Sequence, residues 1–231
     1  MIRTNRPFLP RLLAIACLIG AAPAVAETPR EMLVNAAFHD TDKAAALARI
    51  DRARAGATAL LARNRDDQDA ALVQATALGY RAKLTGNRGD AVAARKQFES
   101  LVARYPRNPE ASVALGAWHI GVIISFGRFI GRAAVGAQKG TGLAALDRAV
   151  ALGGDRAMFL GLAGLLRIEI DPDDARGRQL AEAAVRGSTP TAIDRQFQRA
   201  AAAVLVPLRK GDRKGAQKLA DRLLPLGQFG S

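Results

Sequence analysis

The stretch ASVALGAWHIGVIISFGRFIGRAAVGAQKGTGLAAL, residues 111–146, differs from the rest of this 231-residue chain. It holds the single tryptophan, Trp118, followed by His119, and it contains no aspartate or glutamate. The run 113–124 is apolar apart from His119, which is typical of a helix that is buried on all sides. We therefore expect this run to lie at the core of the fold, with its two glycines allowing close contact with neighbouring helices.

The sequence on both sides of this stretch predicts helices that follow one another in pairs. Apolar residues recur at spacings of three and four, and no segment alternates apolar and polar residues long enough to predict a sheet. The expected helices are 29–38, the segment between a cap at 40–42 and a polar break at 64–67, 68–84, the segment between a cap at Asp90 and a break at 105–109, 157–170, Asp171-Pro172 to Val185, 191–209 and 213–224. The prediction is an all-α protein of about ten helices, with residues 27–231 forming one domain.

The breaks between these helices are nearly periodic. Pro190 follows Gly154 by 36 residues, and Pro225 follows Pro190 by 35 residues. A helix-turn-helix repeat of about 34 residues is the tetratricopeptide period. The spacing predicts five antiparallel helical hairpins stacked side by side, the central one enlarged by an insertion at residues 126–142. An irregular bundle of alanine-rich helices is the alternative.

Residue types inside the hairpins support a comparison with that repeat. The matching residues in the second hairpin are Leu78-Gly79, Gly86, Ala94, Phe98 and Pro106, those in the third are Leu115-Gly116, and those in the last are Gly211-Asp212 and Ala216. The chain therefore resembles divergent tetratricopeptide-repeat proteins across residues 67–225. The resemblance implies a right-handed α-solenoid whose concave groove binds a protein or peptide partner.

A looser resemblance is to exported bacterial helical-repeat proteins that carry a GAWH-type segment after the second hairpin. Some of these are accessory components of periplasmic solute transporters and bind small ligands. A ligand pocket at this point would use Trp118 as a stacking face and His119 as a proton-sensitive donor. The alternative is that both side chains pack in the core with their polar edges satisfied.

The insertion at residues 126–142 combines aromatic, basic and glycine residues. Its candidate binding residues are Phe126, Arg128, Phe129, Arg132 and Lys139. Each of its five glycines lowers helix stability by about 1 kcal/mol, so we expect a partly ordered loop or a broken helix. Three interpretations stay open for it: a cover over one end of the concave face, a contact with anionic lipid headgroups, or a solvated loop.

Residues 1–26 are predicted to be a cleaved export signal. Three arginines precede the apolar run 12–22, and Ala24-Val25-Ala26 offers small residues where a signal peptidase cuts. The apolar run is shorter than the roughly 20 residues that span a bilayer. Because the single cysteine, Cys17, lies inside this run, residues 27–231 can form no disulfide and no thiolate zinc site. We expect a periplasmic or secreted protein.

The charge of the chain limits the partners to expect. It has 34 basic and 21 acidic residues, a net charge of +13. A basic excess is typical of nucleic-acid-binding proteins, but export argues against nucleic acid as the partner. An anionic membrane surface or an acidic protein fits an exported basic chain better. A basic surface that only aids solubility is the alternative.

The sequence contains no recognisable catalytic constellation. His39 and His119 are too few and too isolated for a metal cluster, and neither lies near a nucleophile motif. The glycine-rich segments at Gly86 and Gly140 follow no expected strand, so they are not phosphate loops. We therefore predict a protein that is not an enzyme and needs no cofactor or metal. A protein or peptide partner is the first hypothesis, a small-molecule ligand the second and an anionic membrane the third.

Overall fold

The computed structural model describes residues 26–126 and 128–230, and within them the chain is all-helical. Eleven α-helices and one short 3-10 helix are present, and an isolated bridge between Arg156 and Ser188 is the sole β-type pairing in that part of the chain. The all-α prediction is confirmed. The predicted export signal, residues 1–26, lies outside the described residues apart from its last residue, Ala26.

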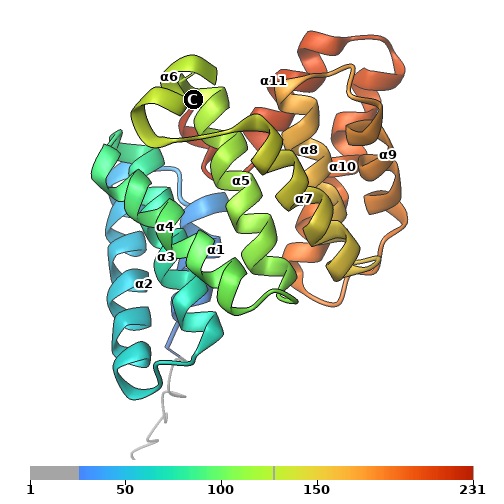
Figure 1. Ribbon diagram of the computed structural model, residues 1–231. Coiled ribbons are helices and arrows are strands. Elements are labelled where there is room, and N and C mark those ends of the chain that lie inside the picture. The colour runs from blue at the N-terminus through green and yellow to red at the C-terminus, as the bar shows by residue number, and fades with distance from the viewer. Residues whose placement is uncertain (1–25, 127, 231) are drawn as a thin grey trace, which may run out of the picture.

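The helices follow the expected order. They are α1 (Pro29–Phe38), α2 (Lys43–Arg63), α3 (Gln68–Thr85), α4 (Arg88–Arg104), α5 (Pro109–Phe126), α6 (Arg128–Val135), α7 (Lys139–Gly153), α8 (Ala157–Ile170), α9 (Ala175–Arg186), α10 (Ala192–Arg209), α11 (Arg213–Leu223) and the 3-10 helix η1 (Gly227–Phe229). Figure 1 shows them laid out broadly in chain order, from α2 at one side through α5 and α7 to α9 and α10 at the other. No helix in the described ranges combines the length and the apolar character that crossing a membrane requires.

The helices pack as successive pairs. Contacts join α1 to α2, α3 to α4, α5 to α7, α8 to α9 and α10 to α11, while α2, α4, α7 and α9 also contact the first helix of the next pair. The short α6 is inserted inside the third pair and touches α4 and α5. This lateral order agrees with the pairs expected from the spacing of the breaks. The superhelical handedness and the tetratricopeptide geometry stay predictions.

Side-chain caps explain where most helices begin. Asp42, Asp67, Asp174 and Asp212 each accept a hydrogen bond from the backbone N–H three residues further on. Helices α1 and α10 begin with capping boxes, in which a threonine and the acidic residue three positions later satisfy each other's N–H groups. Each such cap stabilises its helix by about 1 kcal/mol. The bounds expected for α1 and α8 are confirmed to the residue.

Two expected helix starts are wrong. Helix α4 is capped by Asn87, whose side-chain oxygen accepts from the N–H of Asp90, so Asp90 lies inside the first turn. Helix α9 begins at Ala175 and not after Asp171. The side chain of Asp171 accepts from the N–H of Asp173, which makes a turn that contains Pro172, and Asp174 then caps the helix. In both places two candidate capping residues lie within a few positions of each other. Local hydrogen bonding makes Asn87 the cap in place of Asp90, and Asp174 the cap in place of Asp171.

The most enclosed helix is α8, not α5. All residues from Ala157 to Glu169 are buried, and only Ile170, the last residue of α8, is partly exposed. Helix α5 has a partly exposed side that includes Ala114, Ala117 and Val122, so the expectation that it is buried all round is wrong. Within the described residues both helices contact five others, so the partly exposed side of α5 reflects incomplete coverage by its neighbours and not a smaller number of them.

Glycines set the closest helix contacts. A Cβ at Gly164 of α8 would lie 2.9 Å from the backbone nitrogen of Ala181 in α9, so no other residue fits there. The close contact expected at Gly116 is confirmed, because a Cβ there would lie 2.8 Å from the side chain of Leu146. At Gly121 the expectation is wrong, since no atom of the described residues lies within 4 Å of a Cβ at that position.

The two ends of the helical array meet. The rings of Phe38 at the end of α1 and Phe197 in α10 pack edge to face, with centroids 5.9 Å apart. After α11 the chain returns to α1, where the N–H of Leu226 donates to the carbonyl of Ala37 at 2.9 Å. Leu226 is fully buried in a cluster formed by α1, α2 and α3. The first and last helix pairs are therefore joined directly.

Candidate functional site

The structure places Trp118 and His119 in the core. Their exposed fractions are 8% and 2%. Trp118 belongs to a cluster with Leu78 of α3 and Phe98 of α4, and its ring meets that of His119 edge to face with centroids 5.0 Å apart. The burial and the ring contacts agree with the core-packing interpretation, although Nε2 of His119 has no hydrogen-bond partner in the described residues.

His119 holds the connection between α6 and α7. Its Nδ1 accepts a hydrogen bond from the backbone N–H of Gln138 at 3.2 Å. Burial, and then the positive charge of Arg95, lower the pKa of His119 to about 4, so the ring is neutral at pH 7. Since Nδ1 accepts, the proton sits on Nε2, and this atom is buried without a hydrogen-bond partner in the described chain. A neutral imidazole with this tautomer serves to position the backbone at Gln138.

The insertion contains a broken helix, as the glycines predict. Helix α6 ends at Val135, Gly136 has a left-handed φ of 78°, and α7 begins at Lys139. The left-handed φ explains why the turn contains glycine, since the guanidinium of Arg95, 2.6 Å from the position of a Cβ, could move aside. Lys139 is half-buried at the start of α7. The side chains of Phe126, Arg128, Phe129 and Arg132 lie outside the described part of the structure, so their binding roles stay predictions.

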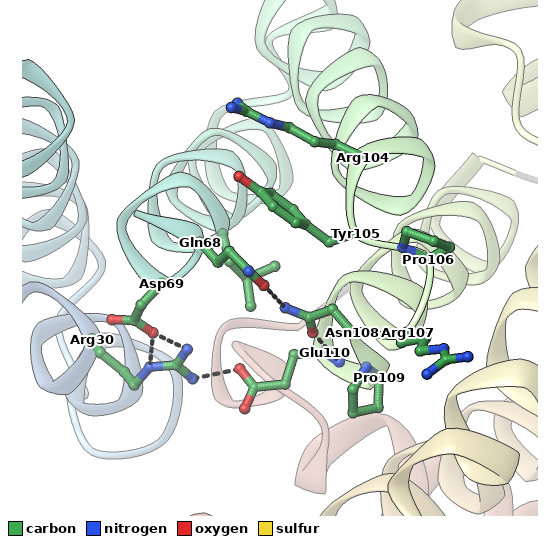
Figure 2. Close-up of a pocket in the computed structure, with 11 residues that line it drawn as sticks. Arg30, Gln68, Asp69, Arg104, Tyr105, Pro106, Arg107, Asn108, Pro109 and Glu110 are labelled. Carbon is green, nitrogen blue, oxygen red and sulfur yellow. Dashed lines mark hydrogen bonds and ion pairs between the residues drawn. The ribbon is translucent and has the colours of Figure 1, made fainter. Parts of the chain in front are cut away.

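An open pocket lies elsewhere, where α1, α3 and α5 begin (Figure 2). Its volume is about 650 Å³. The residues that line it are Arg30, Gln68, Asp69, Leu72, Arg104, Tyr105, Pro106, Arg107, Asn108, Pro109 and Glu110. It is not the pocket expected beside Trp118.

One end of this pocket is an ion-pair network that spans three helices. The guanidinium of Arg30 in α1 binds Asp69 of α3, with Nε 2.6 Å from Oδ1, and Glu110 of α5, with Nη1 2.8 Å from Oε2. Figure 2 shows these three side chains gathered together. One arginine therefore fixes the spacing of three helix starts, and both carboxylates keep further acceptor capacity.

Asn108 fixes the wall between α4 and α5. Its side-chain oxygen accepts from the N–H groups of Glu110 at 2.9 Å and Ala111 at 3.2 Å, which caps α5. Its side-chain nitrogen donates to the side-chain oxygen of Gln68 at 3.2 Å, which ties the loop to the start of α3. The N–H groups at the start of α5 are thus satisfied by the protein, so the pocket offers side chains to a ligand and not a free helix end.

The other end of the pocket is basic and aromatic. Arg104 forms an ion pair with Asp66 and lies over the ring of Tyr105, with its Cζ 5.3 Å from the ring centroid. The Tyr105 hydroxyl donates to the carbonyl of Asp66 at 3.5 Å. Arg107 is exposed and makes no ion pair within the described residues. The pocket thus presents the carboxylates bound by Arg30 on one side, Arg104 with the aromatic face of Tyr105 on another, and Arg107 near Pro109 at the rim.

Sequence reasoning did not identify this pocket. The break at 105–109 and the acidic start of α3 were visible, but they were interpreted only as helix ends and caps. Gln68 and Asn108 are 40 residues apart, and no local signal indicates that they touch. The described residues hold no group of three or more histidine, cysteine, aspartate or glutamate side chains that could bind a metal ion.

Comparison with known proteins adds nothing to the assignment. No family model matches the chain, and no curated protein and no solved structure matches it either. The similarity to tetratricopeptide repeats therefore depends on the residue pattern and the order of helix pairs alone.

Proposed function

We propose that this chain is a non-catalytic binding protein that holds a segment of a partner protein or peptide in the pocket where α1, α3 and α5 begin. The observation that carries the proposal is the polarity of the pocket: the carboxylates of Asp69 and Glu110 on one side, Arg104 beside the ring of Tyr105 on another, and Arg107 at the rim near Pro109. A polypeptide segment with charges of both signs complements this arrangement. Among the described residues that line the pocket there is no histidine, cysteine or serine, so the common pairs of nucleophile and histidine base are not found there.

The rigidity of the pocket supports the same proposal. Arg30 joins three helix starts, and Asn108 joins the loop to α3, so both walls are fixed before any ligand arrives. A site that is already ordered loses little conformational entropy on binding. Arg107 is exposed and forms no ion pair within the described residues, so an ion pair with a ligand would replace no existing one.

The test is a titration of the purified chain with short fluorescein-labelled peptides that are acidic, basic or of mixed charge, followed by fluorescence anisotropy. We expect mixed-charge or acidic peptides to bind and Arg107→Glu to weaken binding about tenfold, because hydrogen bonds to charged groups contribute roughly 1.5–3 kcal/mol. Arg52→Glu is the matched control, since Arg52 is an exposed arginine of α2 that does not line the pocket.

Two results would contradict the proposal. One is that no peptide of any charge class binds. The other is that Arg107→Glu and Arg52→Glu reduce the affinity equally, which would indicate a general effect of net charge and not a site.

The location outside the cytoplasm is part of the proposal. It depends on the pattern of residues 1–26, with arginines, an apolar run and Ala24-Val25-Ala26. Expression in a bacterial host with N-terminal sequencing of the exported form would test it. The expected mature chain begins at Glu27, and a cytoplasmic product that begins at Met1 would contradict the prediction.

A further inference from the structure

The chain ends in a segment, Leu224–Gly230, that folds back from α11 onto the first helix pair; we call it the C-terminal segment. The side chain of Leu226 is fully buried in the same cluster as Leu33 of α1 and Ile50 of α2. The N–H of Leu226 donates to the carbonyl of Ala37 at 2.9 Å. This segment therefore covers apolar surface that belongs to the opposite end of the chain.

The backbone of the C-terminal segment is held in an unfavourable conformation. Leu226 has a φ of 63°, and it is the one non-glycine residue with positive φ in the described part of the chain. Such a conformation persists only where surrounding contacts enforce it. The next residue packs tightly on α11, because a Cβ at Gly227 would lie 2.0 Å from the carbonyl oxygen of Asp221. The position of the segment thus depends directly on the last turns of α11.

A pair of carboxyl groups lies where the C-terminal segment leaves α11. Glu169 of α8 is 7% exposed, and the side chain of Asp221 in α11 acts on it both as a neighbouring negative charge and as a hydrogen-bonding group. Because two carboxylates offer acceptors alone, a hydrogen bond between them requires that one of the two groups holds a proton. Gln217 adds a second tie between the same helices, since its side-chain nitrogen donates to the backbone carbonyl of Glu169.

Lys83 of α3 connects the carboxyl pair to the C-terminal segment. Its ammonium group donates to the carbonyl oxygen of Pro225 at 3.1 Å, and its charge acts on both Glu169 and Asp221. The same ammonium group is thus shared between the segment and the two carboxyl groups. Any increase in negative charge on the pair attracts it away from Pro225.

The surroundings of Glu169 favour its protonated form. Burial first, and then the charge and hydrogen bond of Asp221, raise the pKa of Glu169 to about 8, while the charge of Lys83 acts to lower it. Helices α5, α7, α9 and α10 also pack against α8, but no charged group of theirs is among those that act on Glu169. The proton is therefore retained by the Glu169–Asp221 pair at neutral pH.

We propose that the C-terminal segment is a proton-controlled closure between the last and first helix pairs, held in place by the Glu169–Asp221 carboxyl pair and released when that pair loses its shared proton. Loss of the proton to solvent breaks the carboxyl hydrogen bond and leaves two negative charges beside the turn on which Gly227 packs. It also draws Lys83 from Pro225 to the carboxylates. Release uncovers the apolar surface around Leu33 and Ile50.

The test is hydrogen–deuterium exchange of the purified chain from pH 5 to pH 9, with rates corrected for the intrinsic pH dependence of exchange. The protection of residues 224–230 should fall as pH rises, by up to about tenfold per pH unit, and should level off above pH 8, because the closed form binds one more proton than the open form in that window. In Glu169→Gln the protection should no longer depend on pH. Glu99→Gln, at an exposed glutamate of α4, is the matched control and should behave as the wild type.

Asp221→Asn provides an independent variant in case Glu169→Gln folds poorly. Its amide can donate to an ionised Glu169, so the segment should stay protected at every pH. Peptides from residues 157–168 in α8 monitor the global fold and should remain protected throughout. A pH-independent wild type, an unchanged slope in both variants, or an α8 that is no better protected than the segment at pH 8 would each overturn the proposal.

Discussion

The carboxyl groups of Asp194 and Glu169 are buried at opposite ends of α8. At neutral pH that of Asp194 is ionised and that of Glu169 is protonated. Asp194 belongs to α10 and is fully buried beside the start of α8. It accepts hydrogen bonds from the N–H of Met158 at 3.1 Å and from the guanidinium of Arg156 at 3.0 Å. Although burial acts to raise its pKa, hydrogen bonds from Arg156, Thr191 and Met158 hold that pKa below the usual value for aspartate. Glu169 has another carboxyl group as its partner, and its pKa rises to about 8.

The difference shows that donors, and not depth of burial, decide whether a buried carboxyl group is charged in this protein. Three residues donate hydrogen bonds to Asp194, namely Arg156 through its guanidinium, Met158 and Thr191, so its charge is compensated. Glu169 has one nearby ammonium, and Lys83 shares that group with Asp221 and Pro225. A buried charge that lacks enough donors is neutralised by a proton.

The largest expected effect is that of Asp194→Ala, which removes an acceptor from several buried donors. The N–H of Met158, the guanidinium of Arg156 and the hydroxyl of Thr191 would lose their partner. We expect a loss of about 4–5 kcal/mol in the free energy of unfolding, measured by urea denaturation at pH 7. Asp173→Ala is the control, since Asp173 is exposed and its ion pair with Arg213 should contribute less than about 1 kcal/mol. Equal losses in the two variants would show that Asp194 is not a structural centre of the fold.

The second prediction concerns the stability of the wild type at alkaline pH. Because the pKa of Glu169 is raised from 4.5 to about 8 on folding, the folded chain retains a proton that the unfolded chain has released between these values. Stability should therefore fall as pH rises through this window, by about 4–5 kcal/mol in total, and level off above pH 8. Glu169→Gln should remove that loss, so its advantage over the wild type should grow from pH 4.5 to pH 8. Parallel curves for the two proteins would contradict the assignment.

The fold was predictable where the decisive signals are local. Pro29 marks the start of α1, the turn at Gly153-Gly154 precedes α8, and the glycines between 127 and 142 indicated a helix break. The spacing of these signals also predicted the order of helix pairs. Adjacent caps were harder to separate: at Asn87 and Asp90 two capping residues lie three positions apart, and the sequence does not say which one accepts the first N–H.

The pocket and the carboxyl pair were not predictable, because their members come from distant segments. Arg30, Asp69 and Glu110 meet only because α1, α3 and α5 begin on the same side of the molecule. Glu169 appeared as an ordinary polar residue near the end of an apolar helix, and its environment is created by α11 and α3. The charge state of Glu169 therefore depends on tertiary packing and not on its sequence neighbours.

The third prediction is the opposite pH dependence for His119. Its pKa is lowered from 6.5 to about 4 on folding, so between these values the unfolded chain binds a proton that the folded chain does not. The contribution of His119 to the free energy of unfolding is fully present above pH 6.5, and it should fall by about 3 kcal/mol as the pH decreases to 4. His119→Asn should flatten this acid limb, because an asparagine oxygen can still accept from Gln138 without titrating. His39 is the exposed second histidine, and His39→Asn should leave the loss of stability at acid pH unchanged. If His39→Asn removed that loss and His119→Asn did not, the role given to His119 would be contradicted.

The smallest expected effect is on the pocket itself. Arg107 is exposed and makes no ion pair in the described chain, so neither stability nor its pH dependence should depend on it. Arg107→Glu should change the free energy of unfolding by less than about 0.5 kcal/mol, as should Arg52→Glu, in urea denaturation at pH 7. A larger loss for Arg107→Glu would mean that its side chain supports the loop at 105–109. In that case a weaker affinity for peptides would report a damaged pocket, and only equal stability of the two variants allows a difference in binding to be assigned to contact with the ligand.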